Sequence, residues 1–108
     1  MKWYKNLFLG ESIAPKTHQI IKKIKNNKLT PDVYVIAFAS NPKNLLDIIP
    51  TWEMLQGGYP KEKLCIIGLA KGKQEAIALV TDIVAEVYEK TGDVKIREYL
   101  QNEWREQT

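Results

Sequence analysis

The sequence is poor in the side chains that build metal centres and disulfide frameworks. It contains one cysteine, Cys65, and one histidine, His18, among 108 residues. A single cysteine excludes an internal disulfide, and the spacing typical of a zinc site is absent. His18 has no Cys, Asp or Ser at a spacing that would pair with it, so neither a catalytic triad nor a metal site is predicted. We therefore expect no metal and no cofactor, and we interpret Cys65 as a packing residue of an apolar strand.

Long apolar runs are also missing. No stretch approaches the roughly 18 apolar residues that span a bilayer. The opening segment, residues 1–6, leads into only a few apolar residues before Glu11, unlike a signal peptide. These features predict a cytoplasmic protein without membrane contact. With 44% hydrophobic and 27% charged residues, the chain has an ordinary globular composition, and it is long enough to form one core unaided. A single domain over residues 1–108 is predicted.

The distribution of apolar residues predicts an α/β protein. We expect two strands, Val33–Ala39 and Leu64–Leu69, and helices over Pro15–Asn26, Leu45–Gln56 (kinked or restarted at Pro50), Lys73–Lys90 and the segment after Asp93. The residues before Gly10 form either a short strand or an extended segment. The two firm strands are separated by a helix-containing segment long enough for a parallel crossover. The expected fold is therefore a small parallel sheet of two or three strands with a right-handed βαβ crossover, in the order αβαβαα.

Parallel strands would bring two polar turns to one edge of this sheet. The turn after the first strand contains Ser40, Asn41 and Lys43, and the turn after the second contains Lys71, Gly72 and Lys73. Ligands of open parallel sheets bind outside the carboxyl ends of the strands, so these six residues predict a crevice for a small phosphate or carboxylate. The second turn is too short for a nucleotide-binding P-loop and has Gln74 where magnesium needs a hydroxyl. The crevice offers no general base, so no catalytic residue is assigned.

Charge is unevenly distributed along the chain. Residues 1–30 carry seven lysines against one acidic residue, whereas residues 82–108 carry four basic and seven acidic residues. On the first expected helix, His18, Lys22 and Lys25 lie on the face opposite the isoleucines, which suggests nucleic-acid binding as one alternative. No aromatic residue interleaves with these lysines, and no nucleic-acid-binding motif is present. Complementary charge at the two ends also favours self-association.

The long helix over Lys73–Lys90 carries an apolar arc wider than two or three strands can cover. Either the last helix or a second copy of the chain must cover the remainder. Trp52, Met54 and Trp104 are further interface candidates, because aromatic and Met side chains are enriched at protein interfaces. The favoured interpretation is a non-enzymatic interaction or accessory protein that forms a homodimer or binds another protein. The alternatives are a binder or sensor of a small anion and a nucleic-acid binder.

Five segments together resemble a family of small uncharacterised bacterial proteins of similar length. The segments are Trp3–Leu7, Gly10–Ile13, Val33–Ile36, Ile66–Gly72 and Glu86–Asp93. The resemblance covers nearly the whole chain and implies a complete cytoplasmic protein. It implies no activity and no catalytic residue.

Overall fold

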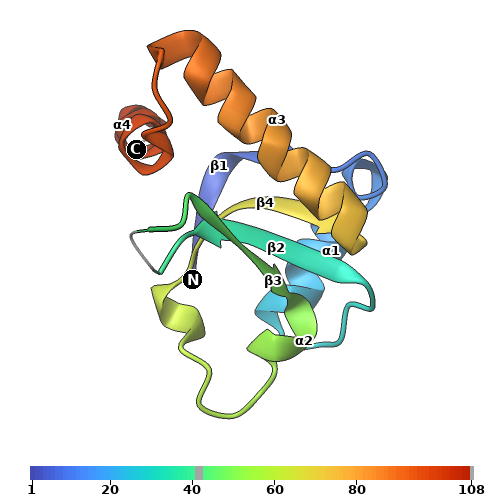
Figure 1. Ribbon diagram of the computed structural model, residues 1–108. Coiled ribbons are helices and arrows are strands. Elements are labelled where there is room, and N and C mark those ends of the chain that lie inside the picture. Colours follow the sequence, from blue (N-terminus) through green and yellow to red (C-terminus); the bar gives the residue numbers. More distant parts are fainter. Residues whose placement is uncertain (41–42, 108) are drawn as a thin grey trace.

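The computed structural model describes residues 1–40 and 43–107, with side chains up to residue 102 (Figure 1). In chain order its elements are β1 (Lys2–Leu9), the 3-10 turn η1 (Ala14–Lys16), α1 (Thr17–Lys25), β2 (Val33–Phe38), β3 (Leu46–Pro50), α2 (Thr51–Met54), the 3-10 turn η2 (Lys61–Lys63), β4 (Cys65–Lys71), α3 (Lys73–Thr91) and α4 (Ile96–Gln107). The chain is α/β. None of the helices in the described part of the chain has both the length and the apolar character to cross a membrane.

The strands form one mixed sheet in the order β1-β4-β2-β3. β1 and β4 are parallel, whereas β2 runs antiparallel to both of its neighbours, β4 and β3. Tyr34, near the start of β2, therefore pairs with Ala70 near the end of β4 and with Pro50 at the end of β3. The expected fold, a parallel sheet of two or three strands with a βαβ crossover between 33–39 and 64–69, is wrong: the sheet has four strands and is mostly antiparallel.

The error begins in the segment expected to be a helix over Leu45–Gln56. Its first part is strand β3, and only the four residues of α2 are helical. The neighbouring β-branched residues Ile48 and Ile49 favour an extended backbone, and they pack on opposite faces of the sheet, as successive strand residues do. Because the connection from Phe38 to Leu46 is short, β2 and β3 pair as an antiparallel hairpin rather than through a crossover.

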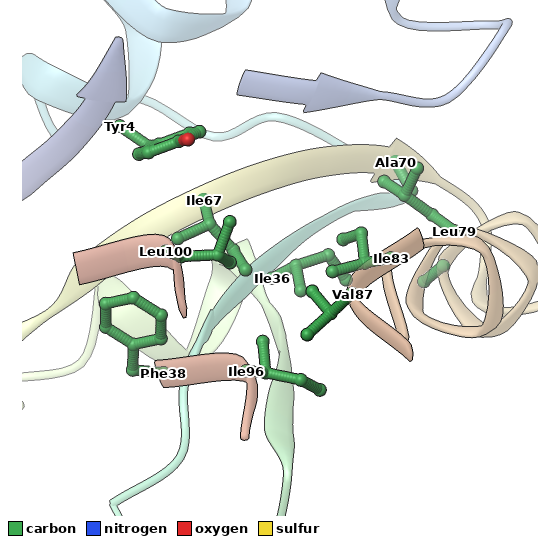
Figure 2. Close-up of a cluster of buried hydrophobic side chains, with 11 residues drawn as sticks. Tyr4, Ile36, Phe38, Ile67, Ala70, Leu79, Ile83, Val87, Ile96 and Leu100 are labelled. Carbon is green, nitrogen blue, oxygen red and sulfur yellow. The ribbon is translucent and has the colours of Figure 1, made fainter. Parts of the chain in front are cut away.

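The two faces of the sheet are covered by different helices. α3 and α4 lie on one face, and α1 and α2 lie on the other (Figure 1). Figure 2 shows the core under α3 and α4, where Ile36 and Phe38 of β2 meet Ile83, Val87, Ile96 and Leu100. The intervening β2 residues join the second core with those of α1 and α2. Its buried members are Ile13, Ile24, Val33, Val35, Ala37, Ile49, Met54, Ile66 and Leu69.

The segment before Gly10, which the sequence left open, is strand β1 at one edge of the sheet. Its pairing with β4 is interrupted between Trp3 and Phe8, where β1 contains extra residues. Close to this irregularity β4 carries Gly68, and a Cβ atom there would lie 2.9 Å from the carbonyl oxygen of Phe8. The absence of a side chain at Gly68 therefore allows β1 to approach β4.

Candidate functional site

The antiparallel course of β2 separates the two turns that were expected to share a crevice. Lys71 pairs with Val33 at the start of β2, whereas Ser40 follows the end of that strand. Six strand residues span about 20 Å. Ser40 and Lys43 therefore lie at one end of the sheet, and Lys71, Gly72 and Lys73 lie at the other; Asn41 lies outside the described residues. The crevice predicted from the parallel arrangement does not form.

At the Lys71 end, a glutamate of α3 occupies the place expected for an anion. Glu75 accepts hydrogen bonds from the backbone N–H of Ser12 at 3.0 Å and from that of Lys71 at 2.5 Å. Partial desolvation raises the pKa of Glu75, but these backbone hydrogen bonds outweigh it and hold the pKa below its ordinary value of 4.5. Its carboxylate thus binds two N–H groups where β1 and β4 end, and these N–H groups are not open to an external anion.

The basic row of α1 faces solvent. His18, Lys22 and Lys25 are all exposed. The fold brings Lys25 over the ring of Trp3, with 5.7 Å between its ammonium nitrogen and the ring centroid. The sequence did not indicate this contact, because 21 residues separate the two positions. Trp3 is half-buried against the core and already carries Lys25 on its ring, so it offers no free platform for a nucleic-acid base. Nucleic-acid binding through this helix stays a prediction.

The three expected interface residues have different environments. Trp52 is 54% exposed on α2, whereas Met54 is 2% exposed and packs inside the core beneath α1 and α2. Met54 is therefore a core residue rather than part of a surface. Trp104 belongs to α4, but its side chain lies outside the described residues.

α3 carries an exposed apolar stripe that follows from the wide arc seen in the sequence. Ile77 and Tyr88 are 49% and 59% exposed, and Val84 is half-buried between them. At 100° per residue these three side chains lie within about 40° of one another on the helix. Glu75, on a different side of the helix, contacts the chain just after β1, so the stripe faces away from β1 and towards β3.

β3 forms the outer edge of the sheet on the side opposite β1. β3 is the last strand in the sheet order, so within the described residues no strand pairs with its outer side. Leu46 and Ile48 of β3 are half-buried and pack against the same core as Val80 and Val84. We call the outer side of β3, taken together with the stripe Ile77, Val84 and Tyr88 of α3, the β3-edge surface. It combines unpaired backbone groups with exposed apolar side chains.

The Ser40 end of the sheet is hollowed on two sides of Arg97. A pocket of about 620 Å³ lies beside the start of α4, and a groove of about 400 Å³ lies between α4 and the loop that precedes β4. Ala39, Ser40, Arg97 and Gln101 line both. Cys65, interpreted from the sequence as a packing residue, is half-buried against the core and lines the groove. Sequence reasoning missed Arg97 because no motif connects it with Ser40.

Two further polar groups of the groove have defined surroundings. Asp47 Oδ2 accepts hydrogen bonds from the backbone N–H of Ser40 at 3.0 Å and from its hydroxyl at 3.3 Å. Burial, followed by the charges of Glu53 and Asp47, raises the pKa of Tyr59, so this residue keeps its phenolic proton at neutral pH. Within the described part of the chain, His, Cys, Asp and Glu side chains form no group of three that would hold a metal ion.

When the chain is compared with models of protein families, with curated proteins and with solved structures, nothing matches. The resemblance to small bacterial proteins therefore stays a prediction. The β3-edge surface and the hollows around Arg97 are the features of the structure that bear on function.

Proposed function

We propose that this chain is a non-enzymatic interaction protein that forms a two-fold dimer through the β3-edge surface. The observations that support the proposal are the exposure of Ile77 and Tyr88 on α3, both about half exposed, and the edge of β3 that pairs with no other strand among the described residues. An open edge is a template for another strand, and proteins guard such edges with charges, prolines or covering segments. β3 has only Asp47 and the terminal Pro50 for this purpose.

A second copy of β3 fits this edge by symmetry. If the two strands pair antiparallel around Ile48, each Ile48 lies opposite its own copy and each Leu46 lies opposite a Pro50. The two sheets then join into one, and both α3 helices lie on the same face of it. Their exposed stripes meet across the two-fold axis, which removes Ile77 and Tyr88 from water.

The charges of α3 are compatible with this arrangement. Asp82, Glu86 and Glu89 lie about 140°, 180° and 120° around the helix from Ile77. They therefore point away from the proposed axis, and pairing of the two helices brings no acidic side chains together. Acidic side chains facing one another across the interface would repel and weaken the association.

The first test is the mass in solution, measured by native mass spectrometry and light scattering at tens of micromolar protein. We expect twice the chain mass of 12.4 kDa. Ile77→Lys and Tyr88→Lys each place a charge in the contact and should raise the dimer dissociation constant by about tenfold or more. Ala78→Lys, at an exposed position about 100° from Ile77, is the matched control and should leave the dimer intact. A monomeric wild-type protein would overturn the proposal.

A second test examines the register. In a Cys65→Ser background, Ile48→Cys should form an intermolecular disulfide under mild oxidation, because paired residues on the axis have Cα atoms about 5.5 Å apart. Leu46→Cys is the control: the two copies would lie about 13 Å apart and should not crosslink. Crosslinking at position 46 without crosslinking at 48 would contradict the proposed axis.

A further inference from the structure

A groove of about 400 Å³ at the Ser40 end of the sheet has the size of small-molecule sites. Its walls come from five places in the chain: the end of β2 with the residues that follow it, β3, the loop before β4, the first residue of β4, and α4. Because it is formed by segments that the core holds in place, its shape does not depend on one mobile loop. Neither Ile77 nor Tyr88 lines it, so it is separate from the exposed stripe of the proposed dimer surface.

Arg97 is held at the rim of this groove by two contacts. Its Nη2 donates a hydrogen bond to the carbonyl oxygen of Ala39 at 2.5 Å, and its guanidinium lies 5.3 Å from the centre of the Phe38 ring. Among the described residues, the other N–H groups of the guanidinium have no partner. A planar guanidinium with a fixed position and unused donors is suited to bidentate binding of a carboxylate or phosphate.

The rest of the groove defines what kind of molecule would carry that anionic group. Leu64, Pro60 and Ile49 supply apolar wall, and Tyr59 supplies an aromatic ring with a neutral hydroxyl. Lys63 adds a second cation, while Asp47 is the acidic residue of the lining. The lining thus carries more positive than negative charge, and its apolar part can cover a hydrocarbon or aromatic body.

From this geometry we infer that the groove binds a small organic anion, with its carboxylate or phosphate on Arg97 and its apolar body against Tyr59 and Leu64. A pair of charge-assisted hydrogen bonds from the Arg97 guanidinium would orient the ligand, and the apolar wall would remove its hydrocarbon or aromatic part from water. Carboxylates and phosphates share this chemistry.

The experiment is an amide and arginine side-chain NMR titration of the full chain with four probes: phenyl phosphate, benzoate, benzyl alcohol and inorganic phosphate. We expect phenyl phosphate or benzoate to shift the Arg97 Nε–H signal and the amides of Ser40 and Leu64. Benzyl alcohol lacks the charge and inorganic phosphate lacks the apolar body, so both should bind more weakly. The tighter of phenyl phosphate and benzoate identifies the anionic group.

Substitutions separate this site from general attraction to lysines. Arg97→Gln should weaken binding of the better probe by about tenfold or more, and Arg97→Lys, which keeps the charge but not the fork, should weaken it less. Lys95→Gln removes the same charge from the neighbouring pocket and should bind almost normally. Ile77→Lys should also bind normally, so failure of the dimer and failure of the groove are distinguishable. Equal affinity in Arg97→Gln, shifts centred on α1, or no shifts at all would each overturn the inference.

Discussion

The two ends of the sheet contain similar residues, with a cationic side chain beside a polar turn, but they are built in opposite ways. At the Lys71 end, backbone N–H groups are already bound. Glu75 accepts from Ser12 and Lys71, and the N–H of Gly72 donates to the carbonyl of Asp32 at 2.7 Å. This end is closed by the protein's own acceptors.

At the Ser40 end, the chain leaves space. Arg97 contributes a cation whose remaining donors face no acceptor among the described residues, and two hollows lie beside it. The comparison shows that lysines and turn residues at a strand end do not by themselves indicate a binding site. What matters is whether the protein's own acceptors occupy the available donors. Glu75 does so at one end, whereas at the other end Asp47 binds Ser40 and the remaining donors of Arg97 have no acceptor among the described residues.

The largest expected effect on stability comes from loosening the pairing of β1 with β4. The segment after β1 contains Ser12, which donates to Glu75 at the Lys71 end of the sheet. In Gly68→Ala the new methyl group would lie 2.9 Å from the Phe8 carbonyl oxygen and 3.4 Å from the Ile36 side chain. Because a backbone atom must move, we expect a loss of about 1–3 kcal/mol in the free energy of unfolding, measured with urea. Gly57→Ala, which has open space around it, is the control and should change stability little.

Hydrogen exchange would add a spatial readout to this variant. Amides of β1 and of residues 10–12 should lose protection in Gly68→Ala, while the amide of Ser40 keeps its exchange rate. A loss of protection at both ends would show that the two ends are not independent.

The sequence was sufficient for the parts of the fold that follow from strong local patterns. The sequence predicts strands over Val33–Ala39 and Leu64–Leu69 and a helix over Lys73–Lys90, and the structure has β2 at Val33–Phe38, β4 at Cys65–Lys71 and α3 at Lys73–Thr91. Gly92, which follows α3, has the left-handed φ of 72° that favours glycine at a helix end. The direction of the strands was not recoverable, because it depended on one short segment. The sequence predicts a helix that includes Leu46–Pro50, whereas the structure has strand β3 there. With a helix in this place the chain would cross over between parallel strands, but with a strand it forms an antiparallel hairpin.

The candidate site was harder still to anticipate. Ser40 lines a hollow, but not the crevice predicted with Lys71, and its role in binding stays a prediction. Arg97, 57 residues further along the chain, has no motif that links it to Ser40. Their proximity results from the antiparallel sheet and from the packing of Ile96 and Leu100, which positions α4. The exposed stripe of α3 is easier to predict from the sequence, because it depends only on the spacing of apolar residues along one helix.

A smaller effect is expected when the closed end loses its internal acceptor. Glu75→Gln keeps the size of the side chain but removes the charge and one carboxylate oxygen, so we expect a loss of about 1 kcal/mol at neutral pH. Glu89→Gln, at an exposed position later in α3, is the control and should be nearly neutral. If both substitutions have the same effect, the hydrogen bonds of Glu75 do not stabilise this end.

The pH dependence of unfolding tests the same contact in the unmodified protein. The pKa of Glu75 is lower in the folded state than its ordinary value of 4.5, so the unfolded chain binds the proton more tightly. The stabilisation is therefore present above that value and is lost as pH falls through the lower folded pKa. The difference in stability between wild type and Glu75→Gln should shrink over this range, measured by urea unfolding at a series of pH values.

The smallest effect is expected at the open end. Ser40→Ala removes a hydroxyl whose bond to Asp47 is 3.3 Å long and exposed, but it keeps the backbone N–H that donates to the same oxygen at 3.0 Å. We expect the free energy of unfolding to change by less than about 0.5 kcal/mol. If Ser40→Ala lowers the free energy of unfolding as much as Glu75→Gln does, the contact between Ser40 and Asp47 stabilises this end as much as the contacts of Glu75 stabilise the other. The contrast between a closed and an open end of the sheet would then no longer hold.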